Sequence, residues 1–281
     1  MELVQKREYN HIGMEPFRFR ISYAEVSRNY PGNQVDSHVH PECEIYINLS
    51  GDVSFMVERH LYPILPGNIV ITRPYEYHHC IQHTDGIHKH FWILFSAGGN
   101  EALLDRFFNR ALGEDNLLVL PSDRQKELFD LCHEMTERLA NPAEELYRFF
   151  KLMHLLESAD IKTPSSNAYP QDIAAVLEYI EQNFNQPISI RSLASAAHVS
   201  VNTLERHFGE VLQMSPTAYI KKKRLANAAE LLYRGSSVME ACQNSGFSDY
   251  SNFIALFKKN YGMTPLRYRR SHMLSFSKKE S

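Results

Sequence analysis

Apolar and polar residues alternate along the first third of the chain. Between residues 17 and 95, runs such as Phe17, Phe19, Ile21 and Tyr23 place an apolar side chain at every second position. A period of two is typical of a β-strand with one buried face. Further short runs rich in β-branched and aromatic residues, separated by turns that contain Gly or Pro, occur at 43–49, 53–57, 69–72 and 90–95. Short strands at such regular spacing predict a β-sandwich or barrel.

From residue 101 onward the apolar residues change to the spacing of an α-helix. Such stripes most often pack against the core of their own domain. We expect Ser122 to cap the second of these helices. The three stripes between residues 101 and 158 are Leu103, Leu104, Phe107 and Phe108, then Leu128, Leu131, Cys132, Met135 and Leu139, then Leu146, Phe149, Phe150, Met153 and Leu156.

A small, polar stretch bounded by prolines, 161–170, predicts a linker. Asp172 is then expected to cap a helix that begins a second, all-helical domain. The apolar face of that helix consists of Ile173, Val176, Leu177, Ile180 and Phe184.

The last quarter of the chain carries one pattern twice, with an offset of 49 residues. A self-similar period in this range indicates a duplicated supersecondary unit. Ser200 and Asp249 are good N-cap residues at equivalent places, and a Pro follows Ser215 and Thr264 at the first position of a further helix. Each copy predicts a helix-turn-helix, at 190–212 and 238–261, whose second helix enters the DNA major groove. The alternative is a plain helical bundle with tight corners. The repeated pattern is Phe208-x4-Gln213-Met214-Ser215-Pro216-x2-Tyr219 and Phe257-x4-Gly262-Met263-Thr264-Pro265-x2-Tyr268.

Composition and charge fit a soluble protein of two domains. The chain has 281 residues, of which 43% are hydrophobic and 22% charged, and its four cysteines are scattered. We find no apolar run of membrane-spanning length and no signal peptide at the start, so we expect a cytoplasmic protein with reduced thiols. Residues 171–281 hold 14 Lys and Arg against 9 Asp and Glu, whereas 1–170 hold 16 against 24. The basic clusters Lys221–Arg224 and Arg267–Arg270 suit contact with DNA phosphates.

The C-terminal pattern resembles the AraC-type DNA-binding domain over about a hundred residues. Two departures matter, since Gln213 stands where that family usually has glycine and Ala255 where arginine is common. We therefore expect a strained helix end at Gln213 and one missing DNA contact at Ala255. The matching segments are Leu193-Ala194, Ser200-x3-Leu204-x-Arg206-x-Phe208, Arg224-Leu225-x2-Ala228-x2-Leu231-Leu232 and Gly246-Phe247-x-Asp249-x2-Asn252-Phe253-x3-Phe257.

The N-terminal strands resemble the cupin barrels. Gly32-x5-His38-x-His40-x3-Glu44-x6-Gly51 matches the first cupin motif, and Pro66-Gly67 with Pro74-x3-His78 resembles the second. The usual inner glycine of the second motif is replaced by Glu76. Cupin-like barrels are common sensor domains in AraC-type regulators, so the two resemblances support one another. In that family the helices after the barrel frequently build a dimer interface, which we favour for 101–160, with intramolecular packing as a close second.

The motif residues of the barrel form the predicted effector site. His38 and His40 project to the same face of a strand, with Glu44 and His78 nearby. One interpretation is a polar pocket that binds a hydroxylated effector without a cofactor, in which Trp92 stacks on a sugar ring. The alternative is one divalent transition metal held by His38, His40, Glu44 and His78. We expect His79, His83, His88 and His90 to lie at strand edges or on the surface.

Residues that point away from the apolar face of each recognition helix are the predicted DNA readers. Arg206 suits guanine or a phosphate, Asn202 suits adenine, and Glu205 can accept from cytosine. The first helix is expected to carry most of the direct base readout, and the second to add apolar and backbone contacts. The full predicted set is Val201, Asn202, Thr203, Glu205 and Arg206, with Asp249, Tyr250, Ser251, Asn252 and Ile254.

The sequence thus predicts an α+β two-domain protein. Residues 1–100 form a cupin-like barrel, 101–160 a helical dimerisation segment, 161–170 a linker and 171–281 the all-helical DNA-binding domain. The expected function is transcriptional regulation, controlled by a small-molecule effector, with double-stranded DNA, a second copy of the chain and, for an activator, RNA polymerase as partners and no membrane. The rival hypotheses are a metal-dependent cupin enzyme with a DNA-binding tail and a constitutive architectural DNA binder.

Overall fold

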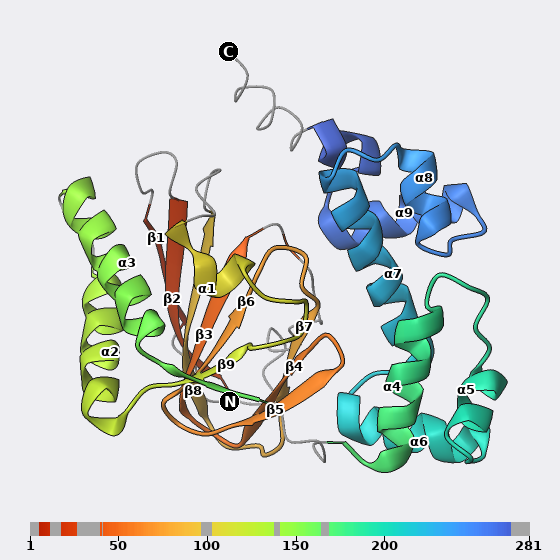
Figure 1. The fold of residues 1–281 in the computed structure, drawn as a ribbon, viewed down its shortest axis with the longest axis horizontal. Coiled ribbons are helices and arrows are strands. Elements are labelled where there is room, and N and C mark those ends of the chain that lie inside the picture. Colours follow the sequence, from red (N-terminus) through yellow and green to blue (C-terminus); the bar gives the residue numbers. More distant parts are fainter. Residues whose placement is uncertain are drawn as a thin grey trace. The chain divides into compact units, whose positions relative to one another are not determined.

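The computed structural model divides into two compact units, Met1–Ala168 and Tyr169–Ser281 (Figure 1). It describes residues 6–11, 18–26, 40, 42–96, 103–137, 141–163 and 169–270. The boundary between the units lies inside the predicted linker, but that linker begins within a strand, since residues 161 and 162 belong to β10. None of the helices in these ranges is long and apolar enough to cross a membrane.

The described part of unit 1 contains two β-sheets with a shared interior. The larger sheet has seven strands in the order β1-β2-β8-β3-β6-β9-β10, and the smaller has the order β5-β4-β7. All strand pairs are antiparallel. The strands are β1 (Lys6–His11), β2 (Arg18–Val26), β3 (Cys43–Ser50), β4 (Val53–Val57), β5 (His60–Ile64), β6 (Asn68–Thr72), β7 (His78–Gln82), β8 (His88–Ser96), β9 (Leu117–Val119) and β10 (Asp160–Lys162). The predicted strands are confirmed, but β1, β5, β7, β9 and β10 were not predicted.

The large sheet separates two layers of side chains, because neighbours along a strand point to opposite faces. Ile45 and Ile47 of β3 face one side, where they join an apolar cluster with Phe91 and Phe95 of β8. Tyr46 faces the other side, where it packs with Phe55 of β4 across the space between the two sheets. The second face therefore lines the interior of the β-domain.

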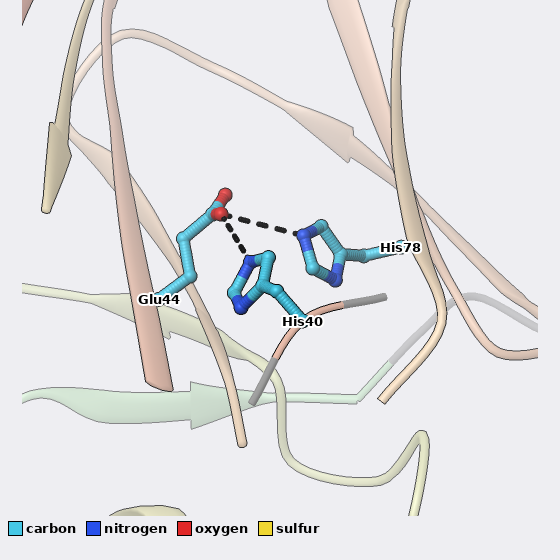
Figure 2. Close-up of side chains that lie close together, drawn as sticks. All are labelled: His40, Glu44 and His78. Atoms are coloured by element: carbon cyan, nitrogen blue, oxygen red, sulfur yellow. Dashed lines mark hydrogen bonds and ion pairs between the residues drawn. The ribbon is translucent and has the colours of Figure 1, made fainter. Parts of the chain in front are cut away.

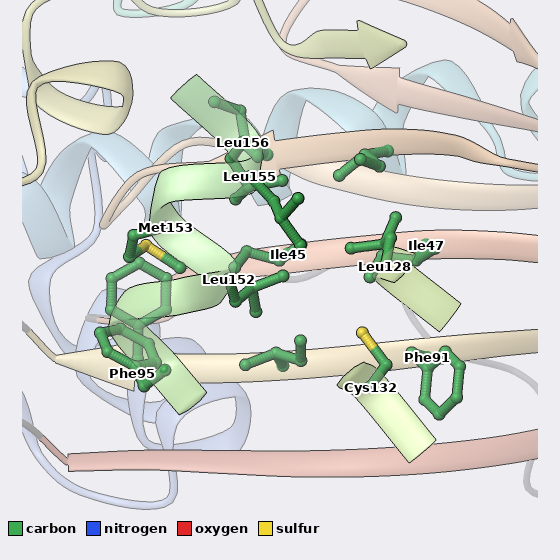
Figure 3. Packing of buried hydrophobic residues seen from close by; sticks show 14 of the residues in the cluster. Ile45, Ile47, Phe91, Phe95, Leu128, Cys132, Leu152, Met153, Leu155 and Leu156 are labelled. Atoms are coloured by element: carbon green, nitrogen blue, oxygen red, sulfur yellow. The ribbon is translucent and has the colours of Figure 1, made fainter. Parts of the chain in front are cut away.

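The helices of unit 1 cover the first face of the sheet. They are α1 (Asp105–Phe108), α2 (Ser122–Met135) and α3 (Pro142–Glu157). Leu128 and Cys132 of α2, and Leu152 and Leu156 of α3, are buried against the isoleucines and phenylalanines of β3 and β8 (Figure 3). Intramolecular packing thus accounts for the buried residues of these apolar stripes, and α2 and α3 belong to the same compact unit as the sheet.

Between residues 169 and 270, unit 2 consists of six helices and a short helical turn at 265–270. Ser200 caps α6 by accepting from the Thr203 N–H, and Asp249 caps α9 in the same way from the Asn252 N–H. Both helix-turn-helix predictions are confirmed. Two other predicted caps are wrong, since Ser122 and Asp172 lie inside the first turns of α2 and α4, after Pro121 and Pro170. The helices are α4 (Gln171–Asn183), α5 (Ile190–Ala196), α6 (Val201–Leu212), α7 (Pro216–Tyr233), α8 (Val238–Asn244) and α9 (Tyr250–Tyr261).

The tight corners of unit 2 use left-handed backbone. Gln213, where the family usually has glycine, ends α6 with a φ of 55°, so the expected strain at this position is present. Gly246 in the second turn has a φ of 79°, and a Cβ there would lie 2.8 Å from the Asn185 backbone. The second turn therefore requires glycine both for its conformation and for its close approach to the end of α4.

Candidate functional site

Three of the motif residues meet on the inner face of the β-domain (Figure 2). The Nε2 atoms of His40 and His78 lie 3.1 and 3.3 Å from the same oxygen, Oε2 of Glu44. His78 Nδ1 also lies 2.8 Å from the carbonyl of Glu76. Because Nδ1 faces a carbonyl and Nε2 faces a carboxylate, this geometry favours the protonated imidazole of His78 beside the Glu44 carboxylate. His38 lies outside the described residues.

Burial and charge act against one another in this pair. Burial alone would raise the pKa of the Glu44 carboxyl, but the charge of His78 and hydrogen bonds from both imidazoles hold it well below its usual value. Burial alone would lower the pKa of His78, yet the Glu44 carboxylate and the Glu76 carbonyl raise it. Glu44 and His78 are 3% and 2% exposed. Glu44 and His78 thus neutralise one another in the interior, so an uncharged polar ligand can bind beside them.

An aromatic row lies next to this pair on the same face. The register aligns Trp92 of β8 with Ser22 of β2 on one side and with Tyr46 of β3 on the other. Paired residues of an antiparallel sheet share a face, so all three side chains point inward. Trp92 is half-buried, and the Arg20 guanidinium lies 5.3 Å from its ring centroid. The accessible Trp92 ring on β8 therefore has the Arg20 guanidinium and the buried Ser22 hydroxyl on the neighbouring strand β2.

A second histidine pair continues the inner face, and sequence reasoning missed it. His88 and His90 stack with ring centroids 4.6 Å apart, and the Tyr46 hydroxyl meets His88 Nε2. The expectation that His88 lies at a strand edge or on the surface is wrong, because it is 3% exposed, and buried His79 is a second error. His83 is exposed as expected. The sequence could have predicted this direction, because His88, His90 and Trp92 occupy every second position along β8 and so lie on the same face of the sheet.

The need for glycine at position 51, the last residue of the first motif, follows from the position of His88. Gly51 has a φ of 112°, and a Cβ there would lie 3.2 Å from three atoms of His88. A side chain at this position would be strained and would also push against His88. The motif glycine thus makes room for an inward-pointing histidine on the neighbouring strand.

Glu76, which replaces the expected motif glycine, anchors a loop at the same end of the β-domain. Its carboxylate is fully buried and pairs with Arg110 through contacts of 2.6 and 2.9 Å. It also accepts from the backbone N–H groups of Gly113 (2.7 Å) and Arg73 (2.9 Å). The departure from the motif therefore has a structural role, because one carboxylate ties the loop 109–116 to the turn before His78.

The predicted DNA-reading residues lie on the outer faces of α6 and α9. Thr203 and Asp249 are also occupied within the N-terminal caps, where the Thr203 hydroxyl lies 2.8 Å from Ser200 Oγ. Ala255 is exposed and offers no side-chain hydrogen bond. Asn202, Glu205, Arg206, Asp249, Tyr250, Ser251 and Asn252 are exposed, and Val201, Thr203 and Ile254 are half-buried.

Half of one basic cluster is turned inward. Lys223 is 7% exposed and its Nζ lies 2.7 Å from Glu181 of α4. Arg224 donates to the carbonyls of Phe184 and Gln186 at 2.6 and 2.7 Å. The prediction of phosphate contacts is therefore wrong for these two side chains, which hold the end of α4, whereas Lys221 remains exposed.

Replacing Arg110 by methionine should destabilise unit 1 by about 3–5 kcal/mol, because it leaves the buried Glu76 carboxylate without its counter-charge. Urea unfolding followed by Trp92 fluorescence measures the change. The matched control is Lys126→Met, which breaks an exposed pair with Asp130 and should leave the midpoint unchanged. Equal midpoints for the two variants would contradict a structural role for Glu76.

Acid should destabilise unit 1 through His88. Burial lowers the pKa of His88 from 6.5 to about 4, so the folded state holds the ring neutral while the unfolded chain takes up a proton. The contribution of the neutral ring is complete above pH 6.5 and is lost as the pH falls toward 4, with a full value of about 3 kcal/mol. The unfolding free energy of the wild type minus that of His88→Phe should therefore fall over this range. A difference that stays constant with pH over this range would contradict it.

Comparison with known proteins assigns a family to both units. The family model of the AraC-like ligand binding domain matches residues 24–156, and that of the helix-turn-helix domain matches 193–271. The chain is 23% identical over 263 residues to the HTH-type transcriptional activator RhaS of Escherichia coli O1:K1 / APEC, covering 87% of this chain and 91% of that protein.

Two further similarities cover parts of the chain. The uncharacterized HTH-type transcriptional regulator YpdC of Escherichia coli K12 is 27% identical over 158 residues, which are 54% of this chain and 55% of that protein. The crystal structure of a probable AraC family transcriptional regulator from Rhodopseudomonas palustris is 27% identical, covers 37% of this chain and 98% of that chain, and gives a TM-score of 0.35. From its ligand-binding domain and the helix-turn-helix domain that follows it, the chain belongs to the AraC family of transcriptional regulators.

Proposed function

We propose that a small hydroxylated molecule, a sugar, binds on the inner face of the β-domain and controls how the regulator binds its promoter. The observation that carries the proposal is the half-buried Trp92 in one row with Ser22 and Tyr46, next to the Glu44 and His78 charge pair. An aromatic ring suits the apolar face of a sugar, and fixed polar groups suit its hydroxyls. A site that hydrogen-bonds hydroxyls also rejects analogues that lack them.

Control of DNA binding requires that the effector prefer one of two arrangements of the chain. The groups that the effector would meet lie on β2, β3 and β8, whose opposite face packs against α2 and α3. A shift of these strands on binding would therefore also move α2 and α3, which pack against their opposite face. The proposed output is a change in promoter occupancy. Activation, with RNA polymerase as the partner, is the direction we infer from the similarity to an activator.

A homodimer is proposed as the working state. The face of α3 turned away from the sheet exposes Tyr147, at 67%, and Phe150, at 36%. Two aromatic side chains one helical turn apart suit an interface with a second copy. A dimer would present two DNA-binding units to two neighbouring sites.

A second candidate is a metal in the same site, as in a metal-dependent cupin enzyme. The ligand atoms of His40, Glu44 and His78 all lie within 4.8 Å of one another. Two imidazoles with one carboxylate are a suitable donor set for a divalent transition metal. Both Nδ1 atoms face backbone carbonyls, those of Glu42 and Glu76, which is the outer support that metal-binding histidines usually have. These three side chains would hold the ion, which would supply Lewis acidity or redox chemistry.

One titration separates the two candidates. Trp92 is the chain's only tryptophan, so its fluorescence reports on the proposed site directly. We expect a member of a panel of free sugars to raise the melting temperature and change this fluorescence, with or without chelator. Glu44→Gln should weaken the response at least about tenfold, since it removes a charged hydrogen-bond acceptor. The matched control is Glu134→Gln, whose carboxylate is 56% exposed on α2.

Two results would change the assignment. Stoichiometric metal in the purified chain, with a fluorescence response that chelator abolishes, would favour the metal site. A melting-temperature shift that leaves Trp92 fluorescence unchanged and is equal in Glu44→Gln and wild type would place the effector elsewhere.

For DNA, we propose that α6 carries most of the base readout and α9 adds apolar and backbone contacts. A binding site can be selected from random-sequence duplexes with the full chain and then varied one base pair at a time. Asn202→Ala should relax the preference at one or two base pairs, whereas Tyr250→Ala should weaken binding to all sequences about equally. Lys221→Ala is the control for a pure phosphate contact and should reduce the salt dependence of binding. A stronger loss of base preference in Tyr250→Ala than in Asn202→Ala would reverse the assignment.

A further inference from the structure

A chain of polar contacts connects α4 to the outer face of the recognition helix α6. His207 Nδ1 lies 2.6 Å from Oδ2 of Asp172, near the start of α4. On the other side of the ring, Arg206 NH2 lies 3.0 Å from His207 Nε2. The same guanidinium also donates from NH1 to Oε1 of Glu210 at 3.1 Å. Asp172, His207, Arg206 and Glu210 are called the α4–α6 relay below.

Only one form of the imidazole satisfies both neighbours. A carboxylate accepts hydrogen bonds and a guanidinium only donates them. His207 must therefore carry its proton on Nδ1, where it donates to Asp172, and present a lone pair on Nε2, where it accepts from Arg206. A histidine without Asp172 would be free to carry its proton on Nε2 and would then turn a donor toward Arg206. Asp172 thus selects the tautomer of His207 that presents an acceptor to the Arg206 guanidinium.

The contacts of Arg206 contribute little to the stability of unit 2. The Arg206 side chain is 61% exposed and Glu210 is 59% exposed, so their contact adds little to stability. An exposed arginine ordinarily samples many rotamers, and fixing one of them costs conformational entropy when a ligand is bound. A residue that holds the guanidinium in one direction beforehand reduces that cost.

We propose that His207, oriented by Asp172, is a positioning residue that directs the Arg206 guanidinium toward the DNA base it reads. The inference rests on the base-reading role proposed for α6. In the complex Arg206 exchanges Glu210 for the edge of a guanine, because a base edge and a carboxylate are alternative acceptors for the same fork of N–H groups. The contact to His207 Nε2 remains and keeps the fork in the plane required for bidentate contact.

The test measures base preference at single positions with the full chain. Duplexes derived from a selected binding site carry each base-pair change in turn, and the dissociation constant of each is measured by fluorescence anisotropy. Arg206→Ala should lose about tenfold discrimination at one or two base pairs. His207→Phe, which keeps a ring but neither nitrogen, should lose at least about threefold at the same base pairs and little elsewhere.

Three further variants separate positioning from a general loss of structure. His207→Gln can still donate to Asp172 and accept from Arg206, so it should restore the wild-type preference. Asp172→Ala should reproduce the effect of His207→Phe from a different helix. The matched control is Glu178→Ala, which removes an exposed carboxylate from α4 that contacts Gln182 and should leave the preference unchanged.

The outcomes distinguish the two levels of the proposal. If Arg206→Ala keeps the wild-type base preference, the base-reading role of Arg206 fails and the inference fails with it. If Arg206→Ala loses preference while His207→Phe and Asp172→Ala do not, only the inference is overturned. Uniform weakening by His207→Phe on every duplex, without rescue by His207→Gln, would likewise overturn it in favour of a purely structural contact.

Discussion

The alternation of side chains along β3 and β8 is the constraint on which unit 1 depends. Each strand places apolar residues on the face that α2 and α3 cover, and polar or aromatic residues on the face that lines the interior. A shift of register by one residue would exchange the two faces and bury Glu44 and His88 beneath the helices. The same pairing that builds the core therefore places the charge pair, the aromatic row and the histidine pair together.

Charge inside the β-domain is stable only because each charged group has a fixed partner. Glu44 is paired with His78, and Glu76 is paired with Arg110 and two backbone N–H groups. The two pairs have different roles: Glu76 organises a loop, whereas Glu44 faces the interior beside Trp92. Unit 2 uses polar contacts in a comparable way, since Lys223 and Arg224 hold the end of α4 while the α4–α6 relay reaches the recognition helix.

The two helix-turn-helix units were predictable to within a residue because caps, prolines and turns are local in sequence. Ser200, Asp249 and Gly262 act within three or four residues of themselves, so their pattern is sufficient. Strands β5 and β7 lack simple alternation, and both histidines that begin β7 are buried, so their identity depended on pairing with β4. The Tyr46 partner of His88 and the Arg110 partner of Glu76 depended on residues tens of positions away. Spacing within one segment does not contain that information.

Control of promoter binding by an effector requires the effector site in unit 1 and the DNA-binding site in unit 2 to be thermodynamically coupled. The most direct measurement is the affinity of the full chain for its selected DNA with and without the saturating sugar, together with the affinity for the sugar with and without DNA. Reciprocal coupling requires the two ratios to be equal. We expect equal ratios that differ from one in the wild type, and ratios that approach one in Glu44→Gln. Tight sugar binding with both ratios equal to one in the wild type would contradict it.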